Sequence, residues 1–191
     1  DAARAVDMAT SSQGTLSARY IAGTHNSYSG EARGSIVAQL NRGVRSLEFD
    51  FHDNDFEAIG DYRLGHSSHD SEVELNQGNP RTSELTQWLE LVAQWSDEHI
   101  GHGPLIVLLD SKDNLKDNLN PQSGNLGRLN DILRSTLGQR LYPSAGAGAE
   151  LQVAALRNRI LVVLSGDRTT RTAYVADEGE QPAVTSHASG A

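Results

Sequence analysis

Short apolar runs that end in polar residues recur along the chain, and helical patterns lie between them. Each run has the form of a strand followed by a loop, because its apolar part is as long as a typical strand. The pattern predicts five clear strands and a weaker sixth. In chain order they are ARYIAGTHN, GVRSLEFDFHDND, YRLGHSSHD, PLIVLLDSKD and NRILVVLSGD, with TAYVADE as the sixth.

Three other stretches repeat apolar residues at the three- and four-residue spacing of an amphipathic helix. SIVAQLNRG carries one such face, and Gly43 is expected to end that helix. The second helix is expected to start at a cap formed by Thr82 or Ser83. The expected apolar faces are Ile36, Val37 and Leu40; Leu85, Trp88, Leu89, Val92 and Trp95; and Leu126, Leu129, Ile132, Leu133 and Leu137.

Strands that alternate with helices are typical of parallel β/α units. The glycine-rich fingerprint of a Rossmann nucleotide site is absent, which favours a TIM-type (β/α) barrel. A full eight-stranded barrel takes about 250 residues, whereas this chain has 191. We therefore expect a single domain over residues 1–191, with a polar, turn-rich tail at 179–191. It is either an abbreviated barrel or, as we favour, the N-terminal portion of a barrel without its last strands.

Composition and charge narrow the range of partners. The formal net charge is −9, from 16 basic and 25 acidic residues, and nucleic acid is disfavoured because phosphate contacts need a basic surface. The absence of cysteine excludes disulfides and thiolate metal sites. No apolar run approaches the roughly 20 residues of a membrane span. The chain starts at Asp1 and not at methionine, so we expect a processed, secreted protein, and we expect a monomer.

The run LEFDFH carries the strongest chemical signal. A period of two places Glu48, Asp50 and His52 on one face of a strand, opposite three apolar residues. Two neighbouring carboxylates on one face repel each other unless a cation lies between them. The alternative is an exposed polar face on an edge strand. We favour a metal site, because strands flanked by helices normally carry apolar residues on both faces.

The type of metal follows from the donor atoms. Glu48 and Asp50, with Asp110 at the end of LIVLLD and the amide of Asn26, form an all-oxygen set that suits Ca²⁺ or Mg²⁺.

Three other motifs are weaker. His99 and His102 in HIGH have a spacing that zinc could use, with surface residues as the favoured alternative. DNDFE begins like an EF-hand loop but lacks its glycine and its last glutamate. GHSSH lacks the closing glycine of a nucleophile elbow, so serine-hydrolase chemistry is disfavoured.

Two histidines stand at the ends of separate predicted strands. His25 ends RYIAGTH and His66 ends YRLGH. Because the carboxyl ends of parallel strands lie on one rim, both histidines would flank the acidic site. A proton acceptor, a proton donor and a cation are what the cleavage of a phosphodiester needs.

The ordered motifs GTHNSY, GVRSLEFDFHD, LGH and PLIVLLDSKD resemble the X-region of phosphatidylinositol-specific phospholipase C, and secreted bacterial calcium-dependent members in particular. The resemblance covers Ala18 to Asp113, and LRNRILVVLSGD continues it loosely. It implies a distorted β/α barrel and a calcium-dependent phosphodiesterase. The implied reaction converts a phosphatidylinositol-type lipid to diacylglycerol and a cyclic inositol phosphate.

The resemblance also implies roles for individual residues. His25 is similar to the histidine that activates the attacking hydroxyl or stabilises the transition state, and His66 to the general acid. Asn26, Glu48, Asp50 and Asp110 fall at the positions of calcium ligands, and Glu48 is also a candidate base.

Two departures bear on the substrate. Asp110 replaces a glutamate common in eukaryotic relatives, and Val163 to Ser165 has none of the lysines that grip ring phosphates there. This favours unphosphorylated phosphatidylinositol, or a related phosphodiester, met in transient contact with a membrane surface. Lys112 is a candidate for binding the substrate phosphate, with a solvated loop lysine as the alternative. Two other functions stay open: a glycerophosphodiesterase or sphingomyelinase D type of enzyme, and a non-catalytic binding domain on the same scaffold.

Overall fold

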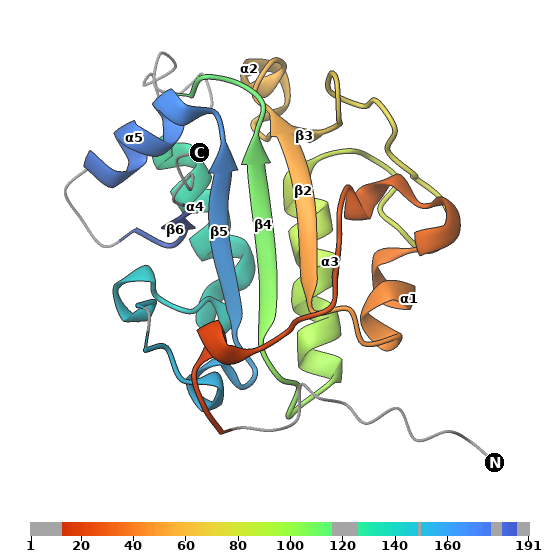
Figure 1. The fold of residues 1–191 in the computed structure, drawn as a ribbon. Coiled ribbons are helices and arrows are strands. Elements are labelled where there is room, and N and C mark those ends of the chain that lie inside the picture. The colour runs from red at the N-terminus through yellow and green to blue at the C-terminus, as the bar shows by residue number, and fades with distance from the viewer. Residues whose placement is uncertain (1–12, 116–125, 149, 177–180, 187–191) are drawn as a thin grey trace.

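One mixed sheet forms the centre of the protein (Figure 1). The computed structural model describes residues 13–115, 126–148, 150–176 and 181–186. Over these residues the strand order is β1-β2-β4-β5-β6, all parallel, with β3 antiparallel beside the end of β2. The described strands form an open sheet with β1 and β6 at its edges. The bounds are β1 Gly23–Thr24, β2 Ser46–His52, β3 Arg63–Leu64, β4 Leu105–Ser111, β5 Ile160–Gly166 and β6 Val184–Thr185.

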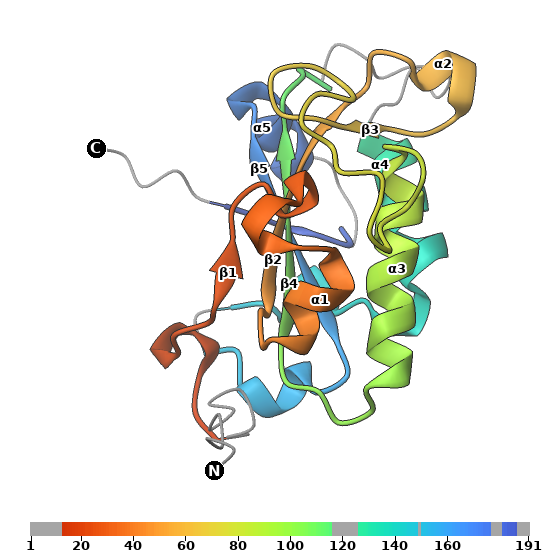
Figure 2. The same cartoon turned by 90° about the vertical axis from the view of Figure 1, so that its right-hand side faces the viewer.

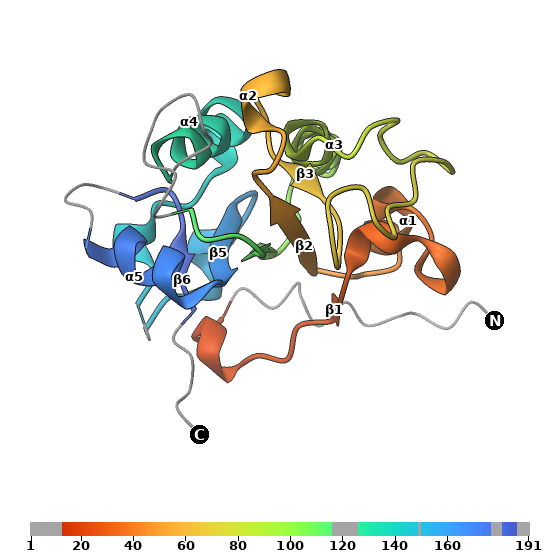
Figure 3. The ribbon, with the colours of Figure 1, turned by 90° about the horizontal axis from the view of Figure 1, so that it is seen from above.

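The two longest helices, α3 and α4, lie side by side on one face of the sheet (Figures 2 and 3). The helix bounds are α1 Ile36–Asn41, α2 Phe56–Ile59, α3 Leu85–Glu98, α4 Leu126–Leu137 and α5 Arg168–Ala176. No helix in the described part of the chain is long and apolar enough to cross a membrane.

The main core lies between the sheet and α3 and α4. Phe49 of β2 meets Trp88 of α3 edge to face, with ring centroids 6.0 Å apart. Both tryptophans are buried, as the helical spacing predicts. The predicted helices are therefore confirmed at Ile36–Asn41, Leu85–Glu98 and Leu126–Leu137.

The opposite face of the sheet is only partly covered. A smaller cluster of Leu151, Leu156 and Leu161 packs there with Leu16. Further along the strands, Leu108 is half-buried. The apolar cover is thus incomplete on the side of the sheet that carries Glu48, Asp50 and Asp110.

One strand prediction near the C-terminus is wrong. TAYVADE is not a strand but lies largely in α5, because Asp167 caps a helix there: its Oδ1 accepts from the backbone N–H of Thr170 at 2.7 Å. Thr170 and Tyr174 then share a buried helical face. Of the predicted tail at 179–191 the structure describes only residues 181–186, where Val184–Thr185 forms β6 and pairs with β5.

The predicted cap of α3 is also wrong. The helix begins after Glu84, not at Thr82 or Ser83, and no side chain caps it locally. Instead Oδ2 of Asp61 accepts from the backbone N–H of Thr86 at 3.1 Å. A carboxylate distant in sequence thus satisfies one of the free N–H groups of the first turn.

Two further local predictions need correction. YRLGH is not a parallel barrel strand, since β3 pairs antiparallel with the end of β2. His102 is not a surface residue but is 7% exposed, with its Nε2 2.7 Å from Oγ of Ser96. Burial, which disfavours the charged ring, lowers the pKa of His102.

Candidate active site

The turn after β1 brings His25 and Asn26 to Glu48 of β2. The backbone N–H of Asn26 donates to Glu48 Oε2 at 2.9 Å, and Nε2 of His25 lies 3.5 Å from the same oxygen. Asn26 has a φ of 48°, in the left-handed region that asparagine tolerates. The hydroxyl of Ser27 secures the turn by accepting from the backbone N–H of Glu48 and donating to the carbonyl of Thr24. His25 is left 72% exposed beside a largely buried carboxylate.

Asp50 and Asp110 are register neighbours on β2 and β4. The hydroxyl of Tyr28 donates to Asp50 Oδ2 at 2.9 Å, and Nζ of Lys112 lies 3.3 Å from that oxygen. The same Nζ donates to Asp110 Oδ2 at 2.8 Å, while Ser165 donates to Asp110 Oδ1 at 2.6 Å. The carboxylate pair is therefore held by groups from three separate segments. β2 is an interior strand, so the edge-strand alternative does not apply.

This environment shifts the pKa values of its partners. Burial raises the pKa of Tyr28 above its usual value, and the neighbouring Asp50 raises it further. Burial by itself lowers the pKa of Lys112, but the hydrogen bond and charge of Asp110, joined by Asp50, outweigh it and raise this pKa. Tyr28 thus remains a donor and Lys112 a cation at neutral pH.

β3 carries His66 back to the same end of the sheet. The backbone N–H of Gly65 donates to the carbonyl of Asp50 at 3.2 Å, and the carbonyl of Gly65 lies 3.1 Å from Nε2 of His52. A Cβ at Gly65 would meet a backbone oxygen of the next turn at 2.0 Å, so this close approach requires glycine. His66 is 43% exposed, with Nδ1 3.5 Å from Glu72 Oε1.

A buried histidine and a half-buried carboxylate support this arrangement, and the sequence pattern assigned them no role. Nδ1 of His52 lies 3.5 Å from Asp113 Oδ2, which also accepts from the backbone N–H of Asp53 at 2.8 Å. Burial alone lowers the pKa of His52, but its hydrogen bond to Asp113 and the charge of that residue outweigh burial and raise the pKa. The period of two in LEFDFH is the signal that places His52 on this face. Tyr28 and Ser165 were missed as well, because their partners are far away in sequence.

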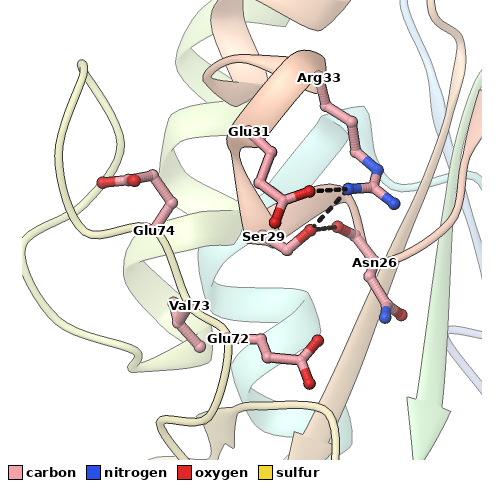
Figure 4. Close-up of a pocket in the computed structure, with 7 residues that line it drawn as sticks. All are labelled: Asn26, Ser29, Glu31, Arg33, Glu72, Val73 and Glu74. Atoms are coloured by element: carbon pink, nitrogen blue, oxygen red, sulfur yellow. Dashed lines mark hydrogen bonds and ion pairs between the residues drawn. The ribbon is translucent and has the colours of Figure 1, made fainter.

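A cavity of about 380 Å³ adjoins the site (Figure 4). Asn26 and Glu72 line it from opposite segments, so it reaches from the turn after β1 to the carboxylate beside His66. Arg33 also lines it and donates to Ser29 Oγ at 2.9 Å. The lining of this cavity offers both hydrogen-bond donors and acceptors to the hydroxyl groups of a polar ligand.

The donor atoms around Glu48, Asp50 and Asp110 fit the predicted calcium ion in part. Within the described ranges, no three Asp, Glu or His side chains gather into a group that could hold a metal. Asn26 Oδ1 and Asp50 Oδ1, however, are buried oxygens without a hydrogen-bond partner. Such orphaned acceptors are rare in folded proteins and call for an explanation, which an ion provides. Since both are hard oxygen donors, this part of the predicted ligand set fits calcium.

The comparison with solved structures identifies the fold. A calcium-dependent phosphoinositol-specific phospholipase C from a Gram-negative Pseudomonas species is similar with a TM-score of 0.73 and 20% identity, over 92% of this chain and 67% of that chain. The calcium-dependent phosphatidylinositol-specific enzyme of Streptomyces antibioticus gives 0.60 and 22%, over 84% and 55%. The phosphatidylinositol-specific phospholipase C of Listeria monocytogenes gives 0.57 and 19%, over the same shares.

The likeness confirms the predicted α/β fold class and the resemblance to the phospholipase C fold. The chain spans about two thirds of the Pseudomonas protein and 55% of the other two. No protein-family model matches the sequence. No curated protein matches it either.

Proposed function

We propose that the chain is a calcium-dependent phosphodiesterase domain that cleaves phosphatidylinositol-type lipids to diacylglycerol and a cyclic inositol phosphate. One observation carries the proposal: at one end of the sheet the exposed His25 lies 3.5 Å from Glu48, and the exposed His66 directly follows Gly65, whose backbone N–H bonds to the carbonyl of Asp50. The fold, shared with enzymes named for phosphatidylinositol cleavage, supports the same reaction class. Action at a membrane surface and secretion are part of the proposal, because the substrate is a membrane lipid and calcium is abundant outside cells.

The chemistry divides between the two sides of the site. On one side, Glu48 takes the proton of the inositol 2-hydroxyl as its oxygen attacks phosphorus, and His25, 3.5 Å from Glu48, stabilises the charge that develops on the phosphoryl group. On the other side, His66 gives a proton to the diacylglycerol oxygen as its bond to phosphorus breaks. Attack within one molecule lowers the entropic barrier, and water can then open the cyclic product.

The proposed cation site uses oxygens already present. Asn26, Glu48, Asp50 and Asp110 would hold calcium, which, when bound, would neutralise the phosphoryl oxygens and acidify the attacking hydroxyl. The hydroxyl of Tyr28 keeps Asp50 in place for this role.

The test is cleavage of phosphatidylinositol vesicles followed by phosphorus NMR, with calcium and with a chelator. We expect a calcium-dependent cyclic phosphate signal. His25→Ala and His66→Ala should each lower turnover by about 10²–10⁴-fold, the usual contribution of general acid–base catalysis. His69→Ala is the matched control, because His69 lies on the same turn as His66, is half-buried, and pairs with Asp70.

The same assay, repeated with the substrate of each alternative enzyme, distinguishes the alternatives. Release of choline from sphingomyelin or lysophospholipid, or of glycerol phosphate from a glycerophosphodiester, without a cyclic inositol phosphate, would favour the other phosphodiesterase types. Binding of calcium and lipid by a folded chain that forms no product would favour a non-catalytic domain.

A further inference from the structure

The ammonium group of Lys112 lies between two of the carboxylates that the proposed calcium site needs. Nζ is 2.8 Å from Asp110 Oδ2 and 3.3 Å from Asp50 Oδ2. The backbone N–H of Lys112 donates to the carbonyl of Phe51 at 3.1 Å, which anchors the base of the Lys112 side chain next to β2. Lysine is rare in this sequence: apart from Lys112 it occurs only at Lys116, outside the described residues.

The carboxylate pair needs a positive charge when no metal is bound. Asp50 is 1% exposed, and Asp110 faces it from the neighbouring strand. Two carboxylates this close repel each other, and an uncompensated buried charge is strongly destabilising. Lys112 supplies one positive charge for two negative ones and leaves Asp50 Oδ1 without a partner. The pair is therefore held together but still short of positive charge.

A calcium ion and the ammonium group cannot share these oxygens. Calcium binds carboxylate oxygens at about 2.3–2.6 Å, and two like charges a few ångströms apart repel strongly away from bulk water. The Lys112 side chain is 29% exposed and its stem is flexible, so it has a path to solvent.

We propose that Lys112 is the internal counter-ion of the metal-free site and competes with calcium for Asp50 and Asp110. Calcium binding then releases the ammonium group from the two carboxylates. This inference rests on the proposed function only for the location of the calcium site.

Calorimetric titration of the full chain with calcium chloride tests the competition. Lys112→Met keeps an apolar stem of similar length and removes the charge, so it should bind calcium about tenfold more tightly than the unaltered chain, which corresponds to about 1.4 kcal/mol. Arg134→Met is the matched control: it removes one positive charge from an exposed position on α4, on the other face of the sheet. Its calcium affinity should equal that of the unaltered chain.

Equal or weaker calcium binding by Lys112→Met, with its circular dichroism unchanged, would overturn the proposal. The same gain in both variants would also overturn it, because net charge alone would then explain the effect. Absence of calcium binding from both the unaltered chain and Lys112→Met would overturn it as well.

A second measurement uses the unaltered chain, in case the variant does not fold. The chain is acetylated with an amine-reactive ester in calcium or in chelator, and modification of Lys112 is followed by mass spectrometry relative to Lys116. We expect Lys112 to react several-fold faster in calcium, because its ammonium group has left the carboxylates. An equal or slower rate in calcium would refute the release.

These outcomes are separate from those that test the enzyme activity. Failure of the proposed function appears as absence of cyclic inositol phosphate at every calcium concentration. Failure of the counter-ion proposal appears as calcium affinity and Lys112 reactivity that do not respond as expected.

Discussion

Replacing Tyr28 with phenylalanine should destabilise the metal-free protein through Asp50. Tyr28 is fully buried, and its hydroxyl donates to Asp50 Oδ2 at 2.9 Å. Phenylalanine keeps the ring and its packing, so the change removes little more than this hydrogen bond. Asp50 already has one oxygen without a partner, and after the substitution only Lys112 would compensate the other.

The expected loss follows from the type of bond. A hydrogen bond to a charged group contributes about 1.5–3 kcal/mol to the free energy of unfolding. For a domain of this size, 1 kcal/mol shifts Tm by about 2–4 °C, so Tyr28→Phe should lower Tm by about 3–12 °C. The measurement is urea and thermal unfolding in the presence of a chelator, because bound calcium would neutralise the charge of Asp50 and mask the loss of the hydrogen bond.

Tyr142→Phe is the matched control, since the hydroxyl of Tyr142 makes a longer, exposed bond of 3.3 Å to the carbonyl of Gly146. It should cost less than about 0.5 kcal/mol. A double-mutant cycle with Asp50→Asn should give a coupling energy above about 1 kcal/mol. If Tyr28→Phe is as stable as Tyr142→Phe, the assumed role of the Tyr28–Asp50 bond is wrong.

Other predictions concern stability, pH and the position of His66. Because the pKa of His102 is lower in the folded protein than its usual value, the unfolded chain takes up this proton first, so the contribution of His102 to the free energy of unfolding should fall as pH drops below about 6.5, opposite in sign to that of His52, whose pKa is raised. Urea unfolding of His102→Gln beside the unaltered chain isolates this contribution: the variant should lose less stability on acidification, and an equal loss would contradict this. Gly65→Ala should lower turnover at least about tenfold, because its Cβ would force the His66 turn to move; retained turnover would show that the turn adapts. Trp88→Ala should cost about 3–5 kcal/mol in unfolding experiments, while Ile100→Ala, at an 80% exposed position, should cost little; similar losses would contradict the assigned core.

The sequence was sufficient wherever a local period decides which way a side chain faces. Alternation along LEFDFH placed Glu48, Asp50 and His52 on the face opposite Leu47, Phe49 and Phe51. These three apolar residues lie in the main core, and successive side chains of a strand point to opposite faces. Helical spacing likewise identified the buried faces of α3 and α4. The polar residues at the ends of β1, β2 and β4 lie at the same end of the sheet, because parallel strands share one carboxyl edge.

Partners far apart in sequence were decided only by the tertiary structure. Tyr28 and Asp50 are 22 positions apart, and Asp53 and Asp113 are 60 apart. No periodic pattern specifies such pairs, because they depend on which loops meet after the strands have packed. Tertiary packing also decided the antiparallel direction of β3 and the position of Lys112 between two carboxylates. Local sequence thus determined which groups face the site, while packing determined which of them are in contact. A buried charged group is costly without a partner, and only the tertiary structure decides which partner lies within bonding distance.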